Sequence, residues 1–73
     1  MDEYISKLQE EIAELDKRHK RLHNFICFDP DFEGLTSLEK ILMEDQVNVM
    51  AQYLGILKLR LEIVKGDYGT KGN

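Results

Sequence analysis

The sequence has little cysteine, proline or tryptophan, and these shortages exclude whole classes of small protein. Its 73 residues include one cysteine, Cys27, one proline, Pro30, and no tryptophan. A single cysteine cannot form an intrachain disulfide, and no Cys/His set has the spacing of a structural zinc site. A chain this small buries only about 60% of its unfolded surface, so it needs disulfides, a metal or association. Of these three means of stabilisation, association with further copies of the chain remains, so we predict a homo-oligomer.

The chain also lacks a long apolar run and an excess of positive charge. No run approaches the ~20 apolar residues that span a bilayer, and the acidic start has neither the basic nor the apolar part of a signal peptide. The net charge is −4, whereas general nucleic-acid binding needs a basic surface. We therefore expect no membrane partner and no general nucleic-acid partner. A lone cysteine without an export signal favours the cytoplasm.

Apolar residues recur with heptad spacing in the first third of the chain. Steps of three and four alternate, as is typical of a helix that packs along a partner helix. Acidic residues crowd the start of this segment and basic residues its end, which complements the helix macrodipole. The pattern predicts a helix over residues 2–26, with these seam residues: Ile5, Leu8, Ile12, Leu15, His19, Leu22 and Ile26.

The period breaks over residues 27–35, where Pro30 and Gly34 favour a turn. Thr36 and Glu39 then have the spacing of a capping box, in which each side chain binds the main-chain amide of the other residue. A second helix is predicted over residues 37–65, and Gly66 is placed to end it in a left-handed cap. The apolar side chains of the turn are expected to pin it to the end of the bundle: Phe28, Phe32 and Leu35.

The second predicted helix carries two heptad stripes that together cover roughly 200°, against the ~100° of an ordinary surface helix. One stripe comprises Leu42, Gln46, Val49, Tyr53, Ile56, Arg60 and Ile63. The first helix can cover only one stripe, so the other must meet another protomer. We assign to the oligomer interface the second stripe, which comprises Met43, Val47, Met50, Leu54, Leu57, Leu61 and Val64.

The sequence therefore predicts an all-α fold. Residues 1–66 form an antiparallel two-helix hairpin that assembles into a homo-oligomeric helical bundle, and residues 67–73 form a disordered, Gly-rich tail. Polar residues in the first stripe are expected to find partners across the hairpin. Arg60 is expected to pair with Asp2 or Glu3, and Tyr53 with Glu10 or a main-chain carbonyl. Lining a pocket between protomers is the alternative role.

A basic cluster at Lys17–Arg21 is the feature best suited to a ligand, because arginine and lysine donate charge-assisted hydrogen bonds to phosphates. Helical geometry places three candidates beside the seam and one outward. A solvated helix end explains the same charges without a ligand. In order of preference, the predicted ligand-binding residues are Arg18, Lys20, His23 and Arg21.

The sequence offers little for metal binding or catalysis. His19, His23 and Cys27 recur every four residues and share a helix face, which suits metal ligation. A fourth ligand is missing, and at a seam position such as that of His19 a hydrogen-bonded core histidine is commoner than a metal ligand. No nucleophile has a base beside it, and no phosphate-binding loop occurs. We therefore predict no metal, no cofactor and no enzymatic activity.

One pattern covers most of the chain: Glu14-Leu15-Asp16, Leu22, Phe25-Ile26, Phe32, Leu35, Glu39, Leu42-Met43, Gln46, Met50, Tyr53, Ile56-Leu57 and Arg60. It resembles a group of short helical-hairpin proteins encoded by bacteriophages and prophages. In size and hairpin form the chain is also similar to phage anti-defence sponges, which are hairpin oligomers that sequester the cyclic nucleotides of immune systems such as CBASS. No ligand-binding residue is transferred by this likeness, which is one of architecture.

The resemblance implies a non-enzymatic oligomer of phage type that acts in the cytoplasm of a bacterial host. It would counter host defence by stoichiometric sequestration of a small anionic ligand such as a cyclic nucleotide. Two alternatives stay open. The hairpin could inhibit or adapt a host or phage protein through its outer face, where Ile41 and Leu59 lie off the main apolar arc, or it could be a structural coiled-coil module of a phage assembly.

Overall fold

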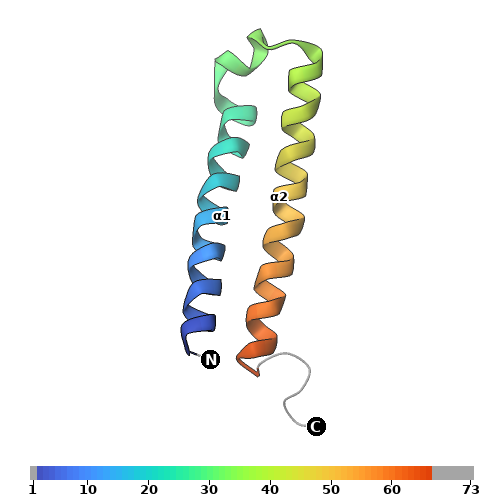
Figure 1. Cartoon of the computed structure of the whole chain (residues 1–73). Coiled ribbons are helices and arrows are strands. Elements are labelled where there is room, and N and C mark those ends of the chain that lie inside the picture. The colour runs from blue at the N-terminus through green and yellow to red at the C-terminus, as the bar shows by residue number, and fades with distance from the viewer. Residues whose placement is uncertain (1, 67–73) are drawn as a thin grey trace.

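Two long helices joined by a short turn make up the computed structural model, which describes residues 2–66. α1 spans Asp2–Phe28, the 3-10 helix η1 spans Pro30–Gly34, and α2 spans Ser37–Val64. The long helices run antiparallel, so the start of α1 and the end of α2 lie at the same end of the hairpin (Figure 1). The predicted all-α hairpin is confirmed over the described residues, which contain no strand, and the predicted tail at 67–73 lies outside them.

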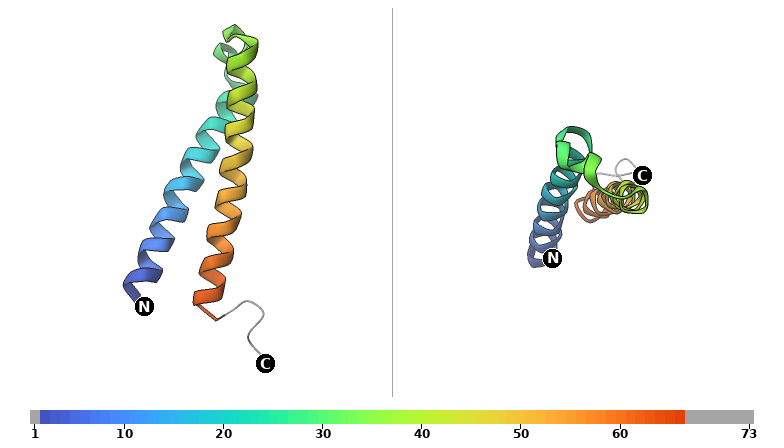
Figure 2. Two further views of the ribbon diagram at one scale, coloured as in Figure 1. Left: turned by 45° about the vertical axis from the view of Figure 1, so that its right-hand side comes forward. Right: turned by 90° about the horizontal axis from the view of Figure 1, so that it is seen from above.

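The hairpin is a narrow rod with principal extents of 52 × 23 × 17 Å. Its two helices are inclined to one another (Figure 2). Because a helix with side chains is about 10–12 Å across, the rod is two helices wide, and each helix faces a neighbour on one side only. Within residues 2–66, neither helix has the length of apolar sequence that a membrane crossing requires.

Hydrogen bonds and one buried ring hold the turn. The Oδ1 atom of Asp29 accepts a hydrogen bond from the amide of Asp31 at 2.9 Å, which caps η1. Phe32 is buried, and its ring meets the ring of Phe25 edge-on with the centroids 6.1 Å apart. The ammonium of Lys40, from α2, lies 5.6 Å from the centre of the Phe32 ring. Phe32 therefore pins the turn to both helices, as predicted.

Phe28 does not pin the turn, and that prediction is wrong. α1 continues through Phe28, two residues beyond its predicted end at residue 26, and the side chain is 77% exposed. Because each helical residue rotates by about 100°, the longer helix carries this ring to the outer side of α1. Leu35, the third predicted anchor, is half-buried.

Both ends of α2 have the predicted local structure. The Thr36 hydroxyl accepts a hydrogen bond from the Glu39 amide at 3.2 Å, and the Glu39 carboxylate accepts one from the Thr36 amide at 3.1 Å. This completes the capping box. At the other end, α2 stops at Val64, one residue before the predicted end, and Gly66 has the left-handed φ of 76°.

The core is a single row of side chains between the helices. α1 contributes Leu8 and Leu15, and α2 contributes Leu54 and Leu57, which has no exposed surface. The partly buried side chains packed against this row are Ile12, Met50, Leu61 and Val64. Burying leucines against each other stabilises such a hairpin by roughly 1.5–3 kcal/mol per side chain.

This core corrects the assignment of the two stripes of α2. The stripe that we assigned to the oligomer interface faces α1, and five of its seven members belong to the core cluster: Met50, Leu54, Leu57, Leu61 and Val64. Its other two members, Met43 and Val47, are half-buried. The stripe is apolar at every position, so it buries against α1 without leaving any polar group to satisfy.

The other stripe, here named the outer stripe, is exposed at every position. The exposed fractions of its four aliphatic members lie between 55% and 61%. Exposed apolar side chains that gather on one face of a soluble protein are typical of an interaction surface. The outer stripe comprises Leu42, Gln46, Val49, Tyr53, Ile56, Arg60 and Ile63.

Candidate functional site

An open groove of about 850 Å³ runs along one side of the hairpin near the turn. This volume lies within the ~300–1,000 Å³ of small-molecule sites. Its apolar floor is formed by Leu22 and Phe25 from α1 and Met50 from α2. The remaining lining residues are four polar residues of the helices, the exposed Phe28 at the end of α1 and two residues of the turn: Arg18, Arg21, Asn24, Gln46, Phe28, Asp29 and Pro30.

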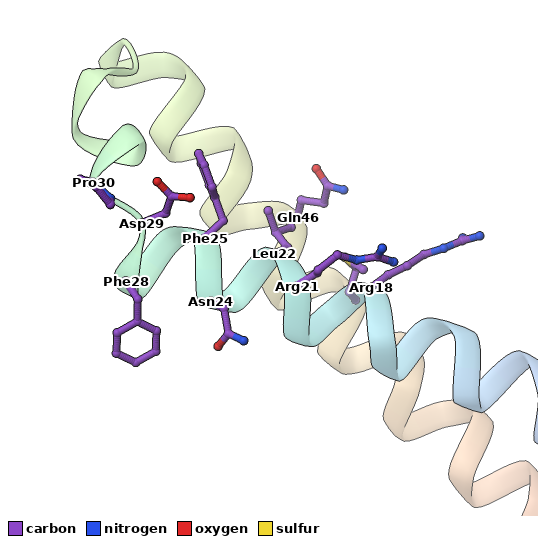
Figure 3. Close-up of a pocket in the computed structure, with 10 residues that line it drawn as sticks. Arg18, Arg21, Leu22, Asn24, Phe25, Phe28, Asp29, Pro30 and Gln46 are labelled. Carbon is purple, nitrogen blue, oxygen red and sulfur yellow. The ribbon is translucent and has the colours of Figure 1, made fainter.

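The side chains of Arg18, Phe25 and Gln46 extend to one side of the two helices, whereas those of Asn24 and Phe28 point the other way (Figure 3). Phe25 is held in place by its edge contact with the buried Phe32. The groove therefore presents apolar surface and guanidinium groups to the same volume. A ligand that combines a flat apolar part with an anionic part matches such a lining.

Two of the four predicted ligand residues lie on this groove. Arg18 and Arg21 are three residues apart, a spacing that makes them neighbours on a helix surface. Within the described part of the chain, no carboxylate lies within ion-pair distance of either guanidinium. Both therefore keep their hydrogen-bond donors available for an anion. Arg21, the one candidate whose helical position predicted an outward direction, also lines the groove.

Lys20 is not among the residues that line the groove. Its ammonium lies 2.9 Å from Oδ2 of Asp16, one turn earlier on α1. This hydrogen bond holds the pKa of Asp16 below its ordinary value, with a further contribution from the charge of Lys58 on α2. Lys20 follows Arg18 by two residues, a rotation of about 200° around the helix, so the two cations face different sides of the hairpin.

His23 also lies away from the groove lining. Its Nε2 atom is 3.6 Å from the Sγ atom of Cys27, and its ring stacks with the ring of His19 at a centroid distance of 6.2 Å. The three residues thus share a face, as their spacing indicates. Within residues 2–66, no group of three or more His, Cys, Asp or Glu side chains has an arrangement that could hold a metal ion.

Two polar bridges join the helices on the side of the outer stripe. The Tyr53 hydroxyl donates a hydrogen bond to Oε2 of Glu11, and Arg60 donates one to the Tyr4 hydroxyl at 2.8 Å. The hydrogen bond to Glu11 raises the pKa of Tyr53, and the one to Tyr4 raises the pKa of Arg60. The partners predicted for Tyr53 and Arg60 were wrong, each by one residue along α1.

These bridges follow a repeat of seven residues that sequence reasoning missed. Tyr4 and Glu11 are seven apart on α1, and Arg60 and Tyr53 are seven apart on α2, so the bridges form successive rungs between antiparallel helices. The next step of seven on each helix gives a third rung, Arg18 and Gln46. Both line the groove, and within the described residues no direct hydrogen bond joins them. The groove opens where this third rung is not closed.

Comparison with known proteins identifies the family. No curated protein and no solved structure matches the chain. The family model described as Sequestin matches residues 2–63, which include both helices except the last residue of α2, together with the turn and the groove. The family name fits a small protein that sequesters a partner. The chain belongs to the Sequestin family.

Proposed function

We propose that this hairpin, as a homo-oligomer, binds a small anionic nucleotide and holds it without changing it chemically. The observation that carries the proposal is the pairing of an apolar groove floor with two guanidiniums, Arg18 and Arg21, that form no ion pair within residues 2–66. A guanidinium matches two phosphate oxygens at once through parallel hydrogen bonds. A nucleobase would lie on the floor, against Phe25 and Met50.

The side chains that line the groove suit a protein that binds its ligand without changing it chemically. The carboxylate of Asp29 is the only titratable lining group besides the two arginines. Its Oδ1 atom already accepts the Asp31 amide, so it has a structural task in capping η1. General acid–base catalysis needs a group within hydrogen-bond reach of the reacting atoms and a pKa suited to its task. We therefore propose a non-enzymatic role.

The biological setting we propose is phage counter-defence in the cytoplasm of a bacterial host. A protein that binds a cyclic-nucleotide immune signal, one molecule per site, lowers the free signal concentration and so silences the effector that the signal activates. The resemblance to phage-encoded hairpins supports this setting, and the name of the Sequestin family supports sequestration. The amount of protein made must then match the amount of signal.

Isothermal titration calorimetry with a panel of cyclic di- and trinucleotides tests the proposal. We expect heat from at least one of them, and recovery of the intact nucleotide from the complex by mass spectrometry. Arg18→Ala and Arg21→Ala each remove charged donors, worth about 1.5–3 kcal/mol, so each should weaken binding by roughly 10- to 100-fold. Lys20→Ala removes the same charge away from the groove and serves as the matched control.

An absence of heat from every nucleotide in the panel would refute the nucleotide ligand. Equal losses in Lys20→Ala and Arg18→Ala would instead show that net charge, and not the groove, controls binding. A nucleotide recovered in cleaved form would refute the non-enzymatic role.

The second candidate is binding to a host or phage protein, as an inhibitor or adaptor. Ile41 and Leu59 favour it, because they lie off the outer stripe and are 53% and 47% exposed. Affinity purification from bacterial lysate should then recover one specific protein with the native chain, and lose it with Ile41→Asp. Recovery of the same proteins by both variants would count against this role.

A further inference from the structure

The outer stripe of α2 has a symmetry that indicates what covers it. Leu42, Val49, Ile56 and Ile63 follow one another at steps of seven residues, and each is more than half exposed. If a second α2 packs antiparallel against the first, Leu42 meets Ile63 of the second copy and Val49 meets Ile56. In such a two-fold contact every pairing occurs twice, as an isologous interface requires.

Charge selects this register among those that a repeat of seven allows. With Leu42 opposite Ile63, Asp45 comes to lie opposite Arg60 of the second copy. A shift by one heptad in either direction places Arg60 opposite Leu38 or Gln52 instead. Within the described residues neither Asp45 nor Arg60 forms an ion pair, and Arg60 uses only its Nη2 atom in the bond to Tyr4.

We propose that the outer stripe binds a second copy of this chain through an antiparallel, two-fold α2–α2 contact centred between Gln52 and Tyr53. The contact runs along α2 from Leu42 to Ile63, which is the full length of the exposed outer stripe. The contact adds a second helix layer to a rod that is 17 Å across in its thinnest direction. The result is a four-helix bundle.

The same contact completes the groove. Gln46 belongs to both the groove lining and the outer stripe, and in this register it faces Leu59 of the second copy. The second α2 therefore lies along the open side of the groove and supplies a wall that a single hairpin lacks. This consequence rests on the proposed nucleotide function, whereas the α2–α2 contact does not.

Cysteine cross-linking of the full chain tests the contact and its register. On a Cys27→Ser background, Val49→Cys combined with Ile56→Cys should give a covalent dimer under mild oxidation, because each cysteine meets the other type across the two-fold axis. Val49→Cys alone cross-links only if the register shifts one heptad toward the turn, and Ile56→Cys alone only if it shifts the other way. Ala51→Cys with Lys58→Cys, which have the same spacing on the opposite face of α2, is the matched control.

Native mass spectrometry and circular dichroism supply the second readout. The wild-type chain should give an even-numbered oligomer, and Ile56→Glu should give folded hairpin monomers, with the association constant lowered by about tenfold or more. Asp45→Arg should weaken association, and adding Arg60→Asp should restore it. A monomeric wild type, an Ile56→Glu variant that stays associated, or cross-linking by either single cysteine would overturn the proposal. A dimer that binds no nucleotide would refute the proposed function and leave the contact standing.

Discussion

Leu57 and Ile56 are neighbours in sequence, yet the structure assigns them opposite roles, and truncating each to alanine separates these roles. Leu57 has no exposed surface and lies in the core row, whereas Ile56 is 55% exposed on the outer stripe. Leu57→Ala removes buried methyl groups and leaves a cavity between the helices, so it should lower the free energy of unfolding by about 2–5 kcal/mol. That loss is a large part of the stability of a chain this small.

Ile56→Ala should behave differently, because its side chain has little contact within its own hairpin. Its expected cost to the hairpin itself is below about 1 kcal/mol. Any larger cost should arise from association, and must then grow with protein concentration, since binding a second copy stabilises the fold by mass action. The loss in Leu57→Ala should appear at every concentration.

Urea denaturation followed by circular dichroism, at several protein concentrations spanning a hundredfold range, measures both effects. Equal and concentration-independent losses in the two variants would show that both stripes are buried within one chain. A larger concentration-independent loss in Ile56→Ala than in Leu57→Ala would refute the core described here. It would also restore the stripe assignment that the sequence suggested.

Three further predictions concern single hydrogen bonds. Thr36→Ala removes the hydroxyl of the capping box and should lower stability by about 1 kcal/mol in the same urea assay. Lys20→Ala should change the acid limb of a plot of unfolding free energy against pH. The hydrogen bond from Lys20 lowers the folded-state pKa of Asp16 below its ordinary value of 3.8. The Asp16–Lys20 pair therefore stabilises the fold above pH 3.8, and this contribution is lost as the pH falls through the folded-state pKa. The hydrogen bond to Glu11 raises the pKa of Tyr53 above its ordinary value of 10, so Tyr53→Phe should remove the tyrosine that ionises at the higher pH in an absorbance titration. The native bond stabilises the fold below pH 10, and this contribution is lost as the pH rises through the raised pKa.

The parts of the fold that depend on neighbouring residues could be predicted from the sequence. The heptad spacing gave both helices, and Thr36 with Glu39 gave the start of α2, because a capping box joins residues only three apart. Phe28 was misplaced because helix ends are set by small differences in local free energy. Two further helical residues were enough to move its ring from the bundle to solvent.

The choice between the two stripes of α2 could not be made from period alone, because both have the same repeat. The polar residues held the missing signal. The outer stripe contains Gln46, Tyr53 and Arg60, whereas the buried stripe is apolar throughout. In a single hairpin, the stripe with no polar group is the one that buries at least cost. Tyr53 and Arg60 lie at the edge of the outer stripe, where they form hydrogen bonds with Glu11 and Tyr4 on α1.

The site follows from the same geometry. Rungs recur every seven residues along the outer side of the hairpin: the Tyr4 and Glu11 rungs are closed by side chains of α2, and the Arg18 rung is not. Phe25, one more step of seven along α1, turns to the buried ring of the turn instead of to α2. Arg18, which forms no ion pair within residues 2–66, therefore lies beside half-buried apolar side chains, at the end of the hairpin where the helices are joined. Lys20 has the same charge but is turned toward Asp16, so the rotation of the helix, rather than the count of basic residues, decides which cations line the groove.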